Sequence, residues 1–69
     1  MYKLYENIKL RREALGLSQD ALAIRVGYTG KSMISKIESG KVDLPYSKIL
    51  LFAEALDTTE AALLGWEKL

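Results

Sequence analysis

Neither cysteine nor histidine occurs among the 69 residues of the chain, and proline occurs once. The chain can therefore form no disulfide, no thiolate zinc site and no histidine-based catalytic set. A Gly-rich phosphate-binding loop is also missing, and the acidic residues Asp43, Glu54, Asp57 and Glu60 stand singly. We therefore expect a protein that is not an enzyme and that uses neither a cofactor nor a metal ion.

Long apolar runs are absent as well. No stretch reaches the ~18 apolar residues of a membrane-spanning helix, and the charged, amphipathic N-terminus does not resemble a signal peptide. The length is that of one domain, which we assign to residues 1–69. A core of this size supplies only about 3–5 kcal/mol of stability, which favours regular helix packing or dimerisation.

Positive charge is concentrated in the middle of the chain. The net charge is only +1, but residues 25–48 carry five bases and two acids, whereas residues 49–69 carry one base and four acids. Such an asymmetry orients a domain in the field of a polyanion. The middle third is therefore the segment that we expect to meet nucleic acid.

Residues 18–40 predict two short helices joined by a tight turn. Ser18 is a favourable N-cap for the first helix, in which Leu22, Ala23 and Val26 form an apolar stripe. Gly27 marks its end. The turn follows over residues 28–30.

The second helix is expected from about Lys31 to Ser39, with Thr29 or Gly30 as its cap. Ile34 and Ile37 lie three residues apart and mark its buried side. The opposite face then carries small polar residues and a lysine, namely Ser32, Ser35, Lys36 and Ser39. This face has no bulky acid, so it can approach nucleic acid closely.

Three more helices complete the predicted order. The first spans residues 3–15, with Leu4, Tyr5, Ile8 and Leu15 toward the core and Lys9 and Arg11 in solvent. The fourth has Pro45 in its first turn and a stripe of Ile49, Phe52, Ala53 and Leu56, extended by Leu50 and Leu51. A short last helix, capped by Thr59 or Asp57, contains Ala62, Leu63, Leu64 and Trp66.

A family resemblance rests on the residues of this central stretch. Gly16-Leu17-Ser18-Gln19, Leu22-Ala23, Val26-Gly27, Ile34 and Ile37-Glu38-Ser39-Gly40-Lys41 resemble the Cro and phage-repressor helix-turn-helix family of xenobiotic-response-element-like regulators. The resemblance extends to Leu56 and to Leu63-Leu64-Gly65-Trp66. In one respect the chain differs: the turn between Gly27 and Ile34 is one residue longer, with Tyr28 as the extra residue. Which of Gly30, Lys31 and Ser32 begins the recognition helix is therefore left open.

The resemblance implies an all-α, compact five-helix bundle, a lambda-repressor-like DNA-binding domain. It implies sequence-specific binding of double-stranded DNA by a bacterial or prophage transcriptional regulator, foremost a repressor that binds a near-palindromic operator as a homodimer in the cytoplasm. The alternatives are an antitoxin or protein-interaction module of the same fold, which neutralises a protein partner, and a purely structural bundle. Regulators of this family often continue into a further domain, and Leu69 directly follows the last helix.

Candidate base-reading residues lie on the second helix of the motif. They are Lys31, Ser32, Met33, Ser35 and Lys36. Lysine donates to guanine and serine reads either base partner, whereas Met33 either contacts a thymine methyl or flanks the helix half-buried. We favour Lys31, Ser32 and Lys36 as readers, because a large share of protein–DNA hydrogen bonds goes to the backbone.

The candidate phosphate contacts surround that helix. They are Arg12, Ser18, Gln19, Thr29, Gly30, Ser39, Lys41 and Tyr46. The resemblance implies that Arg12 pairs with Glu38 and faces a phosphate, and that Gln19 braces the recognition helix. In the loop of residues 40–45, Asp43 is expected to point away from DNA or to cap the next helix, and Leu44 to join the core.

The C-terminal apolar residues allow two interpretations. Leu63, Leu64 and Trp66 are more apolar surface than so small a domain can bury, which favours a symmetric dimer contact. Alternatively, Leu63 and Leu64 close the core and Trp66 lies over its edge.

Overall fold

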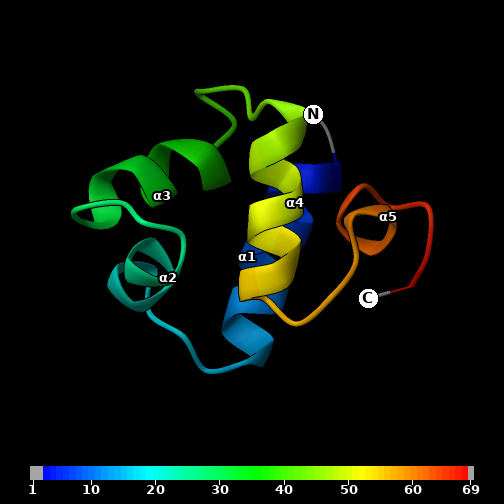
Figure 1. Cartoon of the computed structure of the whole chain (residues 1–69), viewed down its shortest axis with the longest axis horizontal. Coiled ribbons are helices and arrows are strands. Elements are labelled where there is room, and N and C mark those ends of the chain that lie inside the picture. The colour runs from blue at the N-terminus through cyan, green and yellow to red at the C-terminus, as the bar shows by residue number, and fades with distance from the viewer. Residues whose placement is uncertain (1–2, 69) are drawn as a thin grey trace.

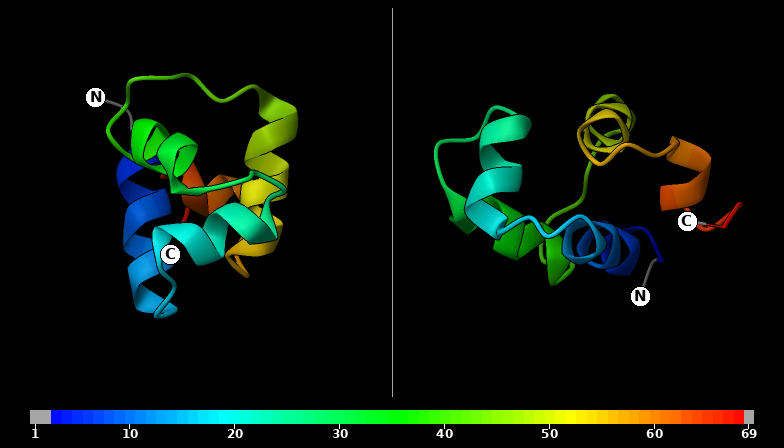
Figure 2. Two further views of the ribbon diagram at one scale, coloured as in Figure 1. Left: turned by 90° about the vertical axis from the view of Figure 1, so that its left-hand side faces the viewer. Right: turned by 90° about the horizontal axis from the view of Figure 1, so that it is seen from below.

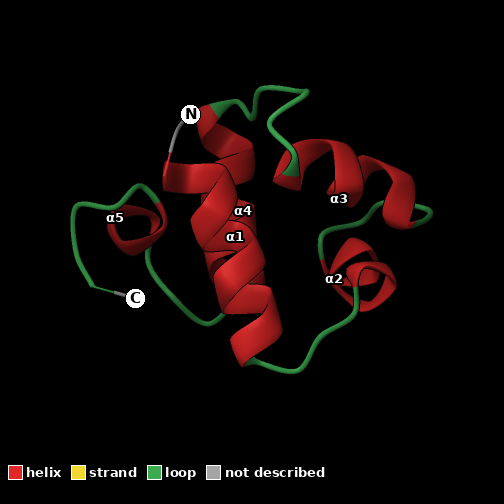
Figure 3. Cartoon of the chain, turned by 180° about the vertical axis from the view of Figure 1, so that it is seen from behind, coloured by secondary structure: helices red, strands yellow, loops and turns green. Residues whose placement is uncertain are grey.

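The computed structural model describes residues 3–68, and in this part of the chain all regular structure is helical. The helices are α1 (Lys3–Ala14), α2 (Gln19–Arg25), α3 (Lys31–Glu38), α4 (Tyr46–Ala55) and α5 (Glu60–Leu63). Helices α1 and α4 form the centre, with α2 and α3 on one side and α5 on the other (Figures 1 and 3). The predicted all-α, five-helix architecture is confirmed. None of the described helices is long and apolar enough to cross a membrane.

All five helices contribute to one core. The largest side chains that are fully buried are Phe52, Ile8, Leu22, Ile34, Ile37, Leu56 and Leu63. Each such burial is worth about 1.5–3 kcal/mol relative to exposure. The stripes read from helical periodicity in residues 22–26, 34–37 and 49–56 are therefore confirmed as core.

Each of the five helices ends with the same pair of backbone hydrogen bonds, the Schellman motif. At the end of α2, the Gly27 N–H donates to the Ile24 carbonyl at 3.2 Å and the Tyr28 N–H donates to the Ala23 carbonyl at 2.9 Å. The left-handed residue is a glycine after four helices and Asp57, with φ of 54°, after α4. These motifs fix the direction in which the chain leaves each helix.

The last carbonyl groups of α4 bind two arginines from other helices. Arg11 of α1 donates from Nε to the Leu56 oxygen at 2.8 Å and from Nη2 to the Asp57 oxygen at 3.0 Å, and Arg25 of α2 donates to the Ala55 oxygen at 2.9 Å. A helix C-terminus leaves carbonyls without partners and carries partial negative charge, so it attracts cations. The expectation that Arg11 lies free in solvent is therefore wrong.

Several expected boundaries shift by one or two residues. Helix α1 ends at Ala14, and Leu15 is half-buried beyond it. Pro45 is the N-cap of α4 and not part of its first turn. Thr59 caps α5 through its side chain, which accepts a hydrogen bond from the Ala62 N–H at 3.1 Å.

Two predictions around α4 need correction. Leu50 does not extend the core, because its side chain turns outward and is 42% exposed. Asp43 does not cap α4; its Oδ1 accepts a hydrogen bond of 3.2 Å from the hydroxyl of Tyr5 in α1. Leu44 and Leu51 are half-buried and pack against the core.

Candidate nucleic-acid interface

Helix α3 lies at the surface, on the side of the molecule that is remote from α5 (Figures 1 and 2). Its inner side chains, Ile34 and Ile37, are fully buried. The exposed residues of the helix are Lys31, Ser32, Met33, Ser35 and Lys36. The structure thus brings the five candidate base readers together on one accessible helix that carries two lysines.

The first residue of α3 is Lys31, and Gly30 is its N-cap without a side-chain hydrogen bond. Of the three residues that the sequence left open, Lys31 is therefore the one at which the helix begins. Thr29 does not cap the helix, and its side chain is exposed. As at any helix start, the first backbone N–H groups of α3 lack acceptors within the helix.

Tyr28, which the family resemblance predicts to be the extra residue of the turn, packs inward. Its ring centroid lies 6.4 Å from that of Phe52, and the Lys48 Nζ lies 5.4 Å from the Tyr28 centroid. A cation at this distance over an aromatic face is attracted to it. The insertion therefore joins the turn to α4 and leaves the outer face of α3 unobstructed.

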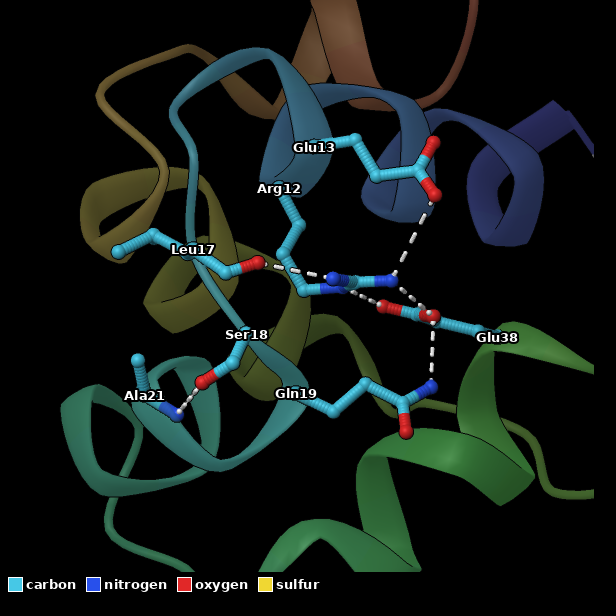
Figure 4. Close-up of polar contacts among 7 residues, drawn as sticks. All are labelled: Arg12, Glu13, Leu17, Ser18, Gln19, Ala21 and Glu38. Atoms are coloured by element: carbon cyan, nitrogen blue, oxygen red, sulfur yellow. Dashed lines mark hydrogen bonds and ion pairs between the residues drawn. The ribbon is translucent and has the colours of Figure 1, made fainter.

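A buried ion pair connects α1 to the end of α3 (Figure 4). Arg12 donates from Nε to Glu38 Oε2 at 2.6 Å and from Nη2 to Glu38 Oε1 at 3.1 Å, a two-point geometry. Gln19 Nε2 donates to the same Oε1 at 3.1 Å, and Arg12 Nη1 donates to the Leu17 carbonyl at 2.8 Å. One carboxylate of α3 is thus bound by side chains of α1 and α2.

This pair is shielded from water. The side chains of Arg12 and Glu38 are 10% and 4% exposed. The hydrogen bonds that Arg12 donates to the Glu38 carboxylate raise the pKa of Arg12 above its usual value, so the guanidinium stays charged. Because the Glu38 charge is compensated, it does not repel a polyanion near α3. The phosphate contact of Arg12 stays a prediction: the side chain donates to Glu38 and Leu17, and only 8% of the residue is exposed.

The other phosphate candidates flank α3 on adjoining segments. The Ser18 hydroxyl caps α2 by accepting from the Ala21 N–H at 3.0 Å, and the Ser39 hydroxyl donates to the Lys36 carbonyl at 3.1 Å. Lys41 follows in an exposed position, and Tyr46 is 60% exposed at the start of α4. The Gln19–Glu38 hydrogen bond places the start of α2 beside the end of α3.

The bases of the central segment do not all belong to this surface. Arg25 binds the end of α4, and Lys48 lies over the Tyr28 ring. Lys31, Lys36 and Lys41 are exposed on α3 and in the loop that follows it. The positive charge available to a ligand at α3 is therefore smaller than the composition suggests.

Sequence reasoning missed a hollow next to the start of α3. It has a volume of about 270 Å³ and is lined by Tyr28, Thr29, Gly30, Ser32, Met33 and Lys36. The one-residue extension of the turn was the available signal, but periodicity does not show where an inserted side chain packs. Among the described residues, no group of three or more acidic residues is placed to hold a metal ion.

The predicted dimer contact through the C-terminal apolar residues is only partly compatible with the structure. Leu63 is fully buried and closes the core, so it cannot contact a second copy. Leu64 is half-buried against the core, whereas Trp66 is 76% exposed. Trp66 is the residue of the three that keeps most of its side chain accessible.

Comparison with known families and structures agrees with this architecture. The model of the helix-turn-helix family HTH_3 matches residues 8–63. The chain therefore belongs to the helix-turn-helix family. A comparison with curated proteins gave no match.

Several solved structures resemble the chain over most of its length. The hypothetical transcription factor NHTF from Neisseria is 30% identical, with a TM-score of 0.84 over 91% of this chain and 71% of that one. The restriction-modification controller protein C.AhdI from Aeromonas hydrophila is 32% identical, with a TM-score of 0.81 over 90% and 92%. The P22 c2 repressor, solved in complex with a synthetic operator, is 28% identical, with a TM-score of 0.81 over 93% and 96%.

Proposed function

We propose that the chain is a sequence-specific DNA-binding domain of a bacterial transcriptional regulator that acts in the cytoplasm, foremost as a repressor. The observation that carries this proposal is the position of α3, which is exposed along its lysine- and serine-bearing face and buried along Ile34 and Ile37. A helix presented in this way fits the major groove of B-form DNA. The P22 c2 repressor in its operator complex has the same fold.

In this proposal the exposed residues of α3 read bases. Lys31 and Lys36 donate to guanine edges, Ser32 and Ser35 bind either partner, and Met33 contacts apolar groups. The paired Arg12–Glu38 unit holds the helix at a constant angle, which base reading requires because hydrogen bonds depend on direction.

The flanking residues bind phosphates and so set the register on the duplex. These residues are Ser18, Gln19, Thr29, Gly30, Ser39, Lys41 and Tyr46. Thr29 and Gly30 precede α3, and Ser39 and Lys41 follow it, whereas Ser18 and Gln19 lie at the start of α2 and Tyr46 at the start of α4. The hydrogen bond from Gln19 to Glu38 brings the start of α2 next to the end of α3. Such contacts contribute affinity without sequence preference and make binding sensitive to salt.

Two copies on a near-palindromic site would place two α3 helices one turn of duplex apart. Such a homodimer requires a contact remote from α3, and the exposed Trp66 beyond α5 is our candidate. An operator that overlaps a promoter would then be blocked to polymerase.

Selection of random duplexes by the purified protein tests the proposal. We expect recovery of a near-palindromic sequence and a dissociation constant that rises steeply with salt for it. For a scrambled duplex we expect much weaker binding, typically by about 10³-fold or more. Recovery of no sequence, or equal affinity for selected and scrambled duplexes in dilute buffer, would contradict it.

A further inference from the structure

The loop of residues 39–45 runs from the end of α3 to the start of α4 (Figure 1). At its start, the Lys41 N–H donates to a carbonyl of α3 at 2.9 Å. Within the described part of the chain, residues 42–44 make one hydrogen bond, which Asp43 Oδ1 accepts from the hydroxyl of Tyr5 at 3.2 Å. Tyr5 belongs to α1 and is only 4% exposed. A buried side chain of α1 therefore determines where the Asp43 carboxylate lies.

Asp43 places a negative charge close to a positive one. Lys41 is two positions away along the chain, and two residues of backbone span at most about 7 Å. Exposure alternates along the loop: Lys41 and Asp43 are exposed, whereas Val42 and Leu44 are half-buried against the core. Both charged residues thus lie on the outer side of the loop, at a separation that the two side chains can bridge.

Lys41 nevertheless forms no ion pair with another described residue, because both ion pairs in this part of the chain belong to Arg12. The Asp43 carboxylate is instead bound to the Tyr5 hydroxyl. This arrangement matters for a polyanionic ligand. A lysine binds a phosphate by neutralising its charge, and a carboxylate already paired with that lysine would compete with the phosphate.

On the basis of the proposed function, we propose that Tyr5 is a positioning residue of the DNA interface: it holds the Asp43 carboxylate away from Lys41, which leaves the lysine available to a phosphate. Tyr5 is buried and acts through Asp43, without touching DNA itself. Loss of its hydroxyl releases the carboxylate to pair with Lys41. Because a phosphate contact carries no sequence information, affinity then falls for every duplex while base preference is kept.

Removal of the Tyr5 hydroxyl tests this assignment. Tyr5→Phe keeps the ring in the core, and circular dichroism checks that the domain is folded. We expect about two- to fivefold weaker binding of the selected and the scrambled duplex alike, the range that corresponds to a surface ion pair. The slope of log Kd against log salt should fall by up to about 1. In the Lys41→Ala background, Tyr5→Phe should have no further effect, whereas a hydroxyl with a merely structural role would weaken both backgrounds alike.

A rescue experiment isolates the charge of Asp43. In Asp43→Asn the amide oxygen still accepts from Tyr5 but carries no charge, so Tyr5→Phe combined with Asp43→Asn should bind duplexes as tightly as Asp43→Asn alone. The matched control is Glu54→Gln, which removes one exposed negative charge near the end of α4, whereas the loop joins its start. Glu54→Gln should not rescue Tyr5→Phe.

Three results would overturn the proposal: wild-type affinity and salt slope in Tyr5→Phe, an undiminished effect of Tyr5→Phe in the Lys41→Ala background, or the same undiminished effect in the Asp43→Asn background. Failure of the wild-type protein to bind any duplex would instead overturn the proposed function.

Discussion

Arg25, the last residue of α2, donates a hydrogen bond of 2.9 Å to the carbonyl oxygen of Ala55, the last residue of α4. Arg11 of α1 donates to the next two carbonyl oxygens, those of Leu56 and Asp57. The carbonyls just before them, of Ala53 and Glu54, are occupied by backbone N–H groups of the Schellman motif. The last carbonyl groups of α4 are therefore all hydrogen-bonded. Side chains of α1 and α2 both bind them.

Removal of the Arg11 side chain should destabilise the fold. Arg11→Ala loses two hydrogen bonds, each with a net value of about 0.5–1.5 kcal/mol, so we expect a loss of about 1–2 kcal/mol in the free energy of unfolding. Urea denaturation followed by circular dichroism measures it. Lys9→Ala, an exposed change on the same helix, is the control and should stay within about 0.5 kcal/mol of the wild type. An equal loss in both variants would show that the contact with α4 contributes nothing.

Asp57 has the left-handed backbone that glycine occupies after the other four helices. Its φ is 54°, and it is the one non-glycine residue with positive φ in the described part of the chain. Left-handed backbone costs an ordinary L-residue about 1–2 kcal/mol, and less for aspartate. We expect Asp57→Gly to stabilise the fold by about 0.5–1 kcal/mol, after the greater chain entropy of glycine in the unfolded state is subtracted.

Thermal unfolding measures this gain, which corresponds to a rise in Tm of about 2–8 °C for a domain of this size. Gly27→Ala is the matched opposite change, because Gly27 has φ of +87° and nothing lies within 4 Å of an added Cβ. Its expected loss, about 1 kcal/mol, therefore reports backbone strain alone. A Tm for Asp57→Gly at or below that of the wild type would contradict the prediction.

What the sequence could predict follows from how local each signal is. Ile34 and Ile37, three residues apart, define the buried side of α3, and Ser18 is an N-cap by its chemistry. Both interactions lie within one helix, so periodicity and side-chain type are sufficient. The Arg12–Glu38 pair crosses between helices and was expected only from the family resemblance.

Other features depend on partners that leave no trace in the sequence. Arg11 and Arg25 bind backbone carbonyls, which every residue possesses, so nothing in the sequence distinguishes these arginines from solvated ones. Leu50 continues an apolar stripe but faces outward, because α4 buries only the side toward Phe52. The hollow at Tyr28 depends on where a one-residue insertion packs, and that is decided by tertiary contacts.

The Arg12–Glu38 pair gives a prediction about buried charge. Glu38→Gln leaves the charged, buried Arg12 without its counter-ion, a change that typically costs about 3–5 kcal/mol. Because a domain of this size has little more stability than that, the variant should be largely unfolded by circular dichroism. Removing both charges with Arg12→Met and Glu38→Leu should restore a folded domain, because an apolar pair carries no desolvation penalty.

The comparison of the single and the double variant separates charge from packing. If Glu38→Gln folds with nearly wild-type stability, the pair is not the brace that its geometry indicates. If the double variant is no more stable than Glu38→Gln, the loss comes from shape or from the hydrogen bond of Gln19 to Glu38 and not from the unpaired arginine.

The proposed interface predicts different consequences for three basic residues. Lys36→Ala should weaken binding of the selected duplex by about 1–3 kcal/mol and relax the preference at one base position, because Lys36 is proposed to donate to a base. Lys41→Ala should weaken selected and scrambled duplexes alike and reduce the slope of log Kd against log salt by about 1, because a phosphate contact releases counter-ions without reading sequence. Arg25→Ala should leave that slope unchanged, since its guanidinium binds Ala55 in α4.

Lys3→Ala is the charge-matched control for this series, because Lys3 lies beside Gly65 near α5, remote from α3, and an alanine keeps the Cβ that contacts Gly65. Its salt slope and base preference should equal those of the wild type. Titrations of the four variants at several salt concentrations, on the selected and a scrambled duplex, distinguish base reading, phosphate binding and a contact within the protein. Equal weakening by Lys36→Ala on both duplexes would assign Lys36 to a phosphate. A reduced slope for Arg25→Ala would place α2, and not only α3 and its loop, against the DNA backbone.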